Sequence, residues 1–150
     1  MRTQVTAPRL GHVALNASVP QLLADFYRDL LDLQVVRQTS TSLTGDAVLL
    51  SGDPAREDHE LVLLTGAAAR HTAFRVASME QLRARYRRAK RLGLQIPYAL
   101  DAGTAVSFFV RDPEGNAVEI YLATTRSHRC TPPLSDPDQI ARLILGCAPS

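Results

Sequence analysis

The segments LGHVALNA at residues 10–17 and ARHTAFRV at residues 69–76 decide the fold of this chain. Each alternates its side chains around a histidine, His12 in the first and His71 in the second, and a period of two is typical of a half-buried β-strand. The two histidines stand 59 positions apart, and the sequence after each of them repeats at the same offset. A fixed internal period predicts that one structural unit occurs twice.

The repeat extends through both halves of the chain. At the offset of 59 the matching positions are Ala14 and Ala73, Leu23 and Leu82, Tyr27 and Tyr86, Arg28 and Arg87, Val35 and Leu94, Asp53-Pro54 and Asp112-Pro113, and Glu60 and Glu119. Matches on this scale do not arise by chance, so the two halves are expected to contain the same elements in the same order.

In each half, the first strand is followed by an amphipathic helix. Ser18 is expected to cap the first helix, and Ser78 the second, where Gln81 completes a capping box. The apolar residues at helical spacing in the first helix are Leu22, Leu23, Phe26, Leu30 and Leu31. In the second helix, the predicted buried stripe is Leu82, Tyr86 and Ala89, and Gly93 is expected to end the helix.

Three short strands are expected after each helix. Their predicted ranges are 33–40, 46–52 and 59–66 in the first half, and 94–100, 105–112 and 117–124 in the second. The segment Asp112 to Asn116 predicts a hairpin turn, with Gly115 or Asn116 at positive φ.

Each half is therefore a βαβββ module, which cannot close a core alone. The predicted fold is α+β, with modules at residues 9–66 and 69–124 in tandem, forming a curved eight-stranded sheet around a metal-binding cleft. Residues 1–127 are expected to form this domain, and residues 128–150 a C-terminal tail. A short helix is expected in the tail after Asp136, with Ile140, Leu143 and Ile144 on its apolar side.

The composition fits one globular domain. The chain has 150 residues, of which 45% are hydrophobic and 21% charged, with a net charge of +2. Neither a basic face for nucleic acid nor a membrane span or secretory signal is evident, so a cytoplasmic location is expected. Cys130 and Cys147 lack the spacing of a zinc site and are expected to be free thiols.

The alternation of the strands indicates a metal site. It places Glu119 on the same face of its strand as Tyr121, and the repeat makes the faces of His12 and His71 equivalent. A single strand histidine is more often a core or rim residue, but two at repeat positions, together with a strand glutamate that is costly to bury alone, favour metal binding. His12, His71 and Glu119 are therefore the predicted ligands, a set that leaves positions open for substrate.

The sequence resembles the vicinal-oxygen-chelate superfamily, which includes glyoxalases, methylmalonyl-CoA epimerases, fosfomycin-modifying enzymes, bleomycin-binding proteins and type I extradiol dioxygenases. The resemblance covers residues 9–124 and is carried by LGHVALNASVPQLLADFYRDLLDLQVV, RHTAFRVASMEQL and SFFVRDPEGNAVEIYL. It implies the paired βαβββ fold and makes His12, His71 and Glu119 the matching ligand positions. Since one scaffold of this kind hosts many chemistries, the resemblance does not select one reaction.

Among these branches, the segment EDHELVLLTG is most similar to extradiol catechol dioxygenases. This resemblance implies Fe(II), dioxygen and a small catechol, with His59 as the acid-base residue. Two positions depart from the family, since Ala102 and Phe109 stand where a histidine and a tyrosine are usual.

By size and layout rather than by a motif, small single-domain enzymes that open the ring of L-DOPA are the first atypical group to compare. An amino-acid catechol needs a partner for its carboxylate, for which Arg75 is the candidate, with Arg70 and Tyr121 behind it. Arg75, Tyr121 and Phe109 are the expected substrate-binding residues.

The repeat itself supports a rival prediction. Glu60, rather than His59, is equivalent to Glu119, which gives a four-ligand set with His12 and His71 that resembles glyoxalase I, a metal-dependent isomerase. Simple alternation turns only one of His59 and Glu60 toward the metal. Manganese, nickel and zinc remain alternatives to iron. A sequestering protein without metal is a third hypothesis, disfavoured by the retained ligands, and a homodimer is expected in the enzyme hypotheses.

Overall fold

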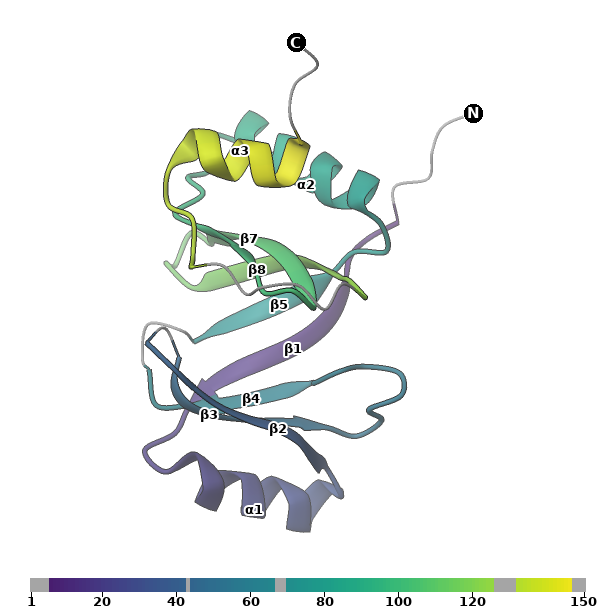
Figure 1. Cartoon of the computed structure of the whole chain (residues 1–150), viewed down its shortest axis with the longest axis vertical. Coiled ribbons are helices and arrows are strands. Elements are labelled where there is room, and N and C mark those ends of the chain that lie inside the picture. The colour runs from purple at the N-terminus through teal and green to yellow at the C-terminus, as the bar shows by residue number, and fades with distance from the viewer. Residues whose placement is uncertain (1–5, 43, 67–69, 126–131, 147–150) are drawn as a thin grey trace. The chain divides into compact units, whose positions relative to one another are not determined.

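The computed structural model describes residues 6–42, 44–66, 70–125 and 132–146 of the chain. Its elements are β1 (Arg9–Asn16), α1 (Pro20–Leu31), β2 (Gln34–Thr41), β3 (Gly45–Ser51), β4 (Leu61–Leu64), β5 (His71–Arg75), α2 (Met79–Arg91), β6 (Ala99–Asp101), β7 (Ala105–Arg111), β8 (Ala117–Ala123) and α3 (Pro137–Leu145) (Figure 1). The order βαβββ thus occurs twice, as the repeat predicted.

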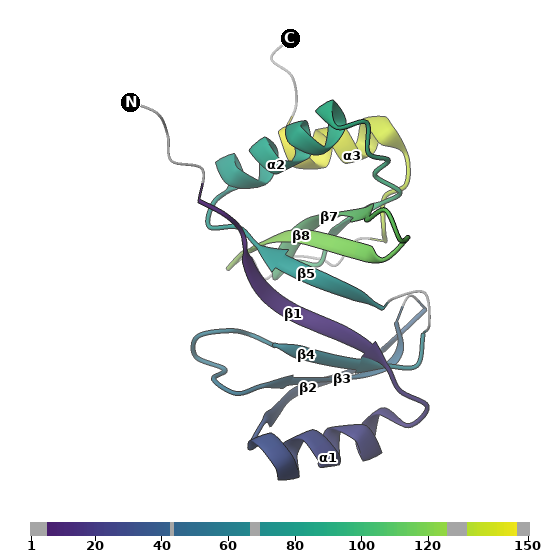
Figure 2. The ribbon, with the colours of Figure 1, turned by 180° about the vertical axis from the view of Figure 1, so that it is seen from behind.

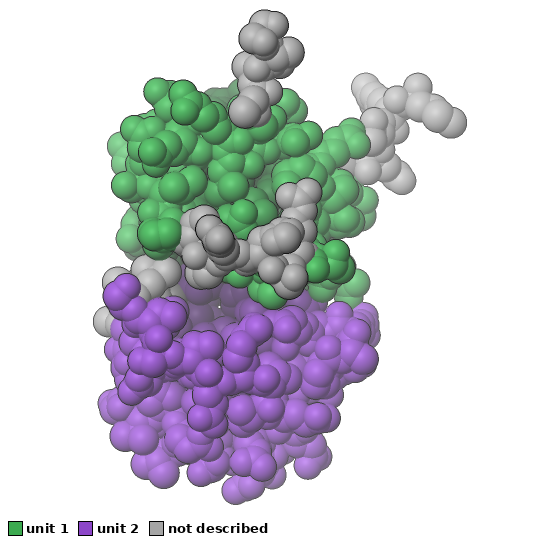
Figure 3. Space-filling view, in the orientation of Figure 1, with its two compact units in different colours: residues 1–10, 73–150 green, residues 11–72 purple. Residues whose placement is uncertain are grey.

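The strands form one eight-stranded sheet in the order β2-β3-β4-β1-β5-β8-β7-β6. The second module has the strand order of the first in reverse, which is the α+β arrangement expected from two copies of one unit. The chain divides into two compact units, one of residues 11–72 and the other of residues 1–10 and 73–150 (Figure 3). No described helix is long and apolar enough to cross a membrane.

In the unit of residues 11–72, apolar side chains cover both faces of the strands. One layer contains Leu50 and Leu63 and packs against Ala24 of α1. The opposite layer contains Ala14, which pairs with Val62 in the parallel register of β1 and β4. His12 lies two residues before Ala14 on β1, so alternation puts its side chain on the face away from α1.

Helix α1 differs from the prediction at its start. Its N-cap is Val19 rather than Ser18, no side chain caps it, and Pro20 is its first residue. Of the apolar residues at helical spacing, Leu22, Phe26 and Leu30 are more than half exposed, and the buried positions are Pro20 and Ala24. Helix α1 therefore carries more apolar residues than one sheet-facing side accommodates.

In the unit of residues 73–150, β6, β7 and β8 are antiparallel, and α2 and α3 lie together over one face of β7 and β8 (Figures 1 and 2). The core between these layers contains Leu82, Tyr86, Phe108, Ile140 and Ile144. The tail helix α3 therefore belongs to the core of this unit, with Ile140 and Ile144 of its predicted apolar side buried.

The predicted signals of this unit are mostly confirmed. The Ser78 hydroxyl accepts a hydrogen bond from the Gln81 N–H at 3.2 Å, and the Gln81 side-chain oxygen accepts one from the Ala77 N–H at 3.0 Å. Asp136 caps α3 in the same way, by accepting from the Gln139 N–H at 2.9 Å. Gly115 takes the positive φ of the hairpin turn, at 83°.

Two strands are shorter than predicted. The range 94–100 reduces to β6, which begins at Ala99, because Pro97 provides no N–H for a ladder. The range 59–66 reduces to β4, which begins at Leu61, so that His59 and Glu60 precede the strand. The two cysteines, Cys130 and Cys147, lie outside the described residues.

Candidate metal centre

Two imidazoles face each other in the unit of residues 11–72. The Nε2 atoms of His12 and His71 are 3.0 Å apart, and the two rings meet edge to face with their centroids at 5.1 Å. His12 is buried, with 6% of its surface exposed, and His71 is half-buried. β1 and β5 supply these side chains, at the positions that the repeat made equivalent.

The spacing of the two nitrogen atoms fits a shared cation. Bonds of about 2.1 Å to one ion, at an angle near 90°, put two imidazole nitrogens about 3.0 Å apart, whereas a tetrahedral angle puts them about 3.4 Å apart. The separation between His12 and His71 would allow both nitrogens to bind one ion, and it is equally the length of a hydrogen bond between the two imidazoles.

Glu119 lies on β8 in the other unit, and only 7% of its surface is exposed. Its partner across the antiparallel ladder is Phe109 of β7, and directly paired residues share a face of the sheet. The neighbouring Phe108 packs in the core below α2 and α3, so Phe109 and Glu119 project from the opposite face. A carboxylate so deeply buried requires a cation or hydrogen-bond donors close to it.

The described residues thus offer three potential ligands in two units, with His12 and His71 in residues 11–72 and Glu119 in residues 73–150. These are the three residues that the sequence predicted as ligands. Two imidazoles and one carboxylate suit Fe(II), Mn(II), Ni(II) or Zn(II), so this donor set is compatible with the expected kind of metal without selecting one.

His59 lies beside the first of these histidines. The centroids of its ring and of the His12 ring are 4.4 Å apart. Its Nδ1 atom is 2.7 Å from an Oδ2 atom of Asp58, which also accepts a hydrogen bond of 2.7 Å from the Arg37 guanidinium. With the Asp58 carboxylate ionised, Nδ1 carries the proton and Nε2 holds the lone pair.

Burial and neighbouring charges shift the pKa values of His59 and Asp58. Burial lowers the pKa of His59 below its usual value, the charge of His12 lowers it further, and Asp58 acts in the opposite direction. For Asp58, partial burial acts to raise the pKa, but the hydrogen bond from His59 and the charge of Arg37 outweigh it, so that the pKa is lowered. His59 is therefore neutral, and Asp58 ionised, near pH 7.

Asp58 and Arg37 were not identified from the sequence. Asp58 directly precedes His59 in the sequence, but its position alone does not show that the two side chains form a hydrogen bond. Arg37 lies on β2, 21 residues before Asp58. Only the hydrogen bond between the two side chains, which the folded chain makes, reveals that Arg37 supports Asp58.

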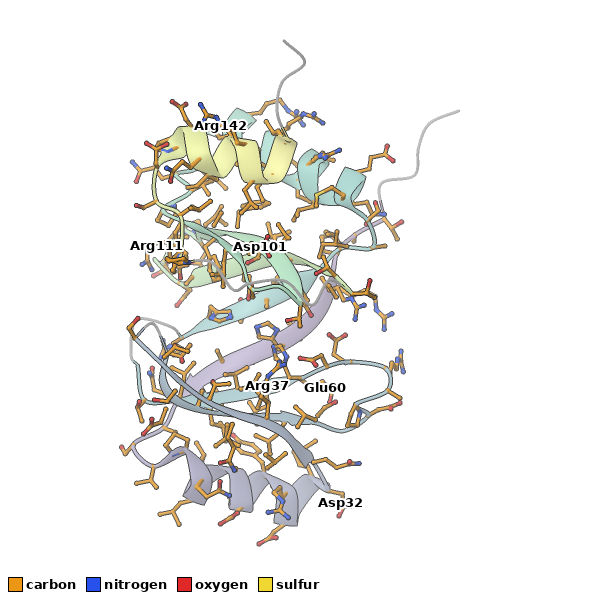
Figure 4. The ribbon with its side chains drawn as sticks, in the orientation of Figure 1. Asp32, Arg37, Glu60, Asp101, Arg111 and Arg142 are labelled. Atoms are coloured by element: carbon orange, nitrogen blue, oxygen red, sulfur yellow. The ribbon has the colours of Figure 1, made fainter. Side chains whose placement is uncertain are left out.

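Glu60 is engaged elsewhere. Its side chain is exposed, and its Oε2 atom accepts a hydrogen bond from the Gly52 N–H at 2.9 Å (Figure 4). Because His59 and Glu60 both precede β4, strand alternation does not govern their directions. The contact of His59 with His12 favours His59 over Glu60 as the residue beside the predicted ligands.

The predicted substrate-contacting residues lie in the unit of residues 73–150. Phe109 and Tyr121 are buried, with 4% and 5% of their surfaces exposed, and Tyr121 is two residues from Glu119 on the same face of β8. Arg75 is half-buried at the end of β5, and Ala102 follows β6. Phe109 and Tyr121 thus flank the predicted carboxylate ligand with aromatic surface.

A family model, described as the glyoxalase/bleomycin resistance protein/dioxygenase superfamily, matches residues 9–120. The chain belongs to this superfamily. Among curated proteins, the chain is similar to biphenyl-2,3-diol 1,2-dioxygenase 3 of Rhodococcus globerulus, with 30% identity over 121 residues. The aligned region covers 77% of this chain and 63% of that protein.

Two solved structures relate this superfamily member to different branches. It is 25% identical to a variant of homoprotocatechuate 2,3-dioxygenase of Brevibacterium fuscum, with a TM-score of 0.62, covering 86% of this chain and 37% of that one. It is 17% identical to methylmalonyl-CoA epimerase of Streptomyces coelicolor, with a TM-score of 0.63, covering 80% of this chain and 100% of that one. The chain spans less than two thirds of the curated relative, and the likeness to the epimerase shows the fold alone.

Proposed function

We propose that this protein is a non-heme Fe(II)-dependent extradiol dioxygenase that cleaves the ring of a small catechol. The observation that carries the proposal is the 3.0 Å spacing of the His12 and His71 nitrogens, to which Glu119 is proposed to add the third ligand. Membership of the superfamily and the similarity to a biphenyl-2,3-diol dioxygenase support it. By its name, that relative acts on an aromatic diol.

In this proposal, His12, His71 and Glu119 hold the ion through two neutral imidazoles and one carboxylate. Fe(II) in this position supplies the one-electron chemistry that lets dioxygen react with an aromatic ring. A catechol loses a proton when it binds a cation in this way, and His59 is the residue proposed to accept that proton. The hydrogen bond from Nδ1 to Asp58 leaves Nε2 of His59 as the nitrogen that takes the proton and returns it later in the reaction.

The substrate is proposed to lie against Phe109 and Tyr121, whose rings provide an apolar wall beside Glu119. Arg75 is the proposed partner of a carboxylate on the substrate, which makes L-DOPA the first catechol to examine. A guanidinium binds a carboxylate through two parallel hydrogen bonds, so this contact would discriminate against catechols without one.

The test is to load the protein with Fe(II) without oxygen, and then to admit air together with each of a panel of catechols that includes L-DOPA. Oxygen uptake and a yellow ring-opened product are expected, and both should be absent with His71→Ala protein treated in the same way. Iron-loaded protein that binds one ion per chain but consumes no oxygen with any of the catechols would contradict the proposal.

The alternative is a metal-dependent isomerase or epimerase that uses His12, Glu60, His71 and Glu119. The observation that favours it is the internal repeat, in which Glu60 is equivalent to Glu119. Turnover of a hemithioacetal by protein loaded with Mn(II), Ni(II) or Zn(II), together with silence toward catechols, would support the isomerase.

We also propose that the protein is a homodimer. The outer side of α1 exposes Leu22, Phe26 and Leu30, one helical turn apart, which is an unusual amount of apolar surface for a helix of a monomer. In α2, the repeat replaces Leu22 and Phe26 with Gln81 and Arg85. The apolar character of this side is thus specific to the first module, as expected if a second copy covers it.

A further inference from the structure

Three residues form a row across neighbouring strands in the unit of residues 73–150. Ala99 pairs with Phe108 in the register of β6 and β7, which brings the preceding residue, Tyr98, beside Phe109. The Phe109 N–H donates to the Tyr98 carbonyl at 3.1 Å, and Phe109 in turn pairs with Glu119. Tyr98, Phe109 and Glu119 therefore lie side by side on the face away from α2 and α3.

The Tyr98 ring is held by stacking. Its centroid is 4.3 Å from that of Phe109, with an angle of 25° between the ring planes. Tyr98 is half-buried, and within residues 6–42, 44–66, 70–125 and 132–146 no hydrogen bond to its hydroxyl is present. A phenol fixed in this way, with its polar end unused, is suited to binding a ligand that has an oxygen acceptor.

The surroundings keep the hydroxyl in its donor form. Burial raises the pKa of Tyr98 and the negative charge of Glu119 raises it further, while Arg111 acts in the opposite direction. The phenol is therefore protonated at neutral pH. Figure 4 labels Arg111, whose guanidinium donates to the Gly115 carbonyl at 2.9 Å and so is directed to the hairpin turn.

We propose that Tyr98 is a substrate-binding residue whose hydroxyl donates a hydrogen bond to an oxygen of the aromatic diol bound beside Glu119. This role rests on the proposed dioxygenase function and adds a residue to it. An anionic diol oxygen is a strong acceptor, and a phenol that already stacks on Phe109 loses little conformational freedom when it donates to one.

The chain offers a matched control in Tyr86. Its hydroxyl is carried by α2 on the opposite face of the same strands, where its ring meets Phe108 edge to face at 5.5 Å. Burial raises the pKa of this phenol as well. Removal of either hydroxyl makes the same chemical change, but only Tyr98 lies on the face of the strands that carries Glu119.

The experiment is an anaerobic titration of iron-loaded protein with catechol, followed by the change in ultraviolet absorption that accompanies loss of the catechol proton. Tyr98→Phe keeps the ring stack and is expected to weaken catechol binding about three- to tenfold, as for one hydrogen bond. Iron content, measured by metal analysis, should equal that of the wild type, because Tyr98 does not touch the ion. Tyr86→Phe should bind catechol as the wild type does.

Equal catechol affinity in Tyr98→Phe and wild-type protein would overturn the role of Tyr98 and leave the dioxygenase proposal standing. An equal loss in Tyr86→Phe would also overturn it, because the effect would then arise from the fold. Wild-type protein that holds iron but binds no catechol would overturn the proposed function and, with it, this role.

Discussion

The Nδ1 atom of His59 lies 2.7 Å from Oδ2 of Asp58, and the same oxygen lies 2.7 Å from the Arg37 guanidinium. The carboxylate thereby determines which nitrogen of His59 exchanges protons, and Arg37 holds the carboxylate. This arrangement resembles the support that catalytic histidines commonly receive, and it makes Asp58 a positioning residue in the proposed reaction.

Asp58→Asn is expected to slow catechol turnover about ten- to a hundredfold, because a charge-assisted hydrogen bond contributes about 1.5–3 kcal/mol. The iron content should not change, since Asp58 is not a proposed ligand. Steady-state oxygen uptake tests this, with the expectation that kcat falls more than KM rises. A KM effect alone would mean that Asp58 shapes the binding site instead.

His59→Ala is expected to leave metal binding intact and to slow turnover about a hundred- to ten-thousandfold, the usual effect of losing an acid-base group. Metal analysis and single-turnover kinetics after anaerobic loading with L-DOPA or catechol measure the two effects separately. Unchanged turnover would remove His59 from the mechanism.

Glu60→Gln distinguishes the dioxygenase from the isomerase. The Glu60 carboxylate accepts from the Gly52 N–H, and the amide oxygen of glutamine can accept the same hydrogen bond. The dioxygenase proposal therefore expects wild-type metal affinity and turnover, measured by competition with a chelator and by oxygen uptake. Loss of metal affinity in this variant would favour the four-ligand isomerase.

His71→Ala and Glu119→Ala should each reduce the iron bound per chain, because each removes one of three proposed ligands. An outcome with one ion per chain in both variants, measured by metal analysis after gel filtration, would contradict the ligand set. Thermal unfolding of the metal-free wild type and variants is the control, and the wild type should gain stability on adding Fe(II) through binding to the folded state.

Phe26→Asp tests the proposed dimer. The side chain is 54% exposed on α1, so the substitution has little cost within one chain but places a charge in an apolar contact between copies. Light scattering at micromolar protein should report a dimer for the wild type and a monomer for the variant. A monomeric wild type would contradict the proposal.

The repeat was sufficient to predict the order of elements, because each module carries its own signals. The capping box at Ser78 and Gln81 and the turn at Gly115 each depend on residues close together in the sequence, so the local pattern predicts them. The two histidines were found for the same reason, since their equivalence follows from one offset.

Other features depend on how distant segments pack together, and local sequence patterns did not predict them. The side of α1 that meets the sheet could not be derived, because apolar residues occur on several sides of this helix. The directions of His59 and Glu60 could not be derived, because alternation holds only inside a strand and both residues precede Leu61. Tyr98 was not identified because it lies inside the predicted strand 94–100, where it reads as an ordinary strand residue. That Tyr98 lies next to Phe109 follows only from the register of β6 and β7.

Helix α3 supplies Ile140 and Ile144 to the core that contains Phe108, and the Arg83 guanidinium donates to the Ile144 carbonyl at 3.1 Å. A shortened version of the chain that stops at the prolines before this helix would uncover a large apolar area and is expected to aggregate. A C-terminal truncation of the chain should therefore end no earlier than Gly146.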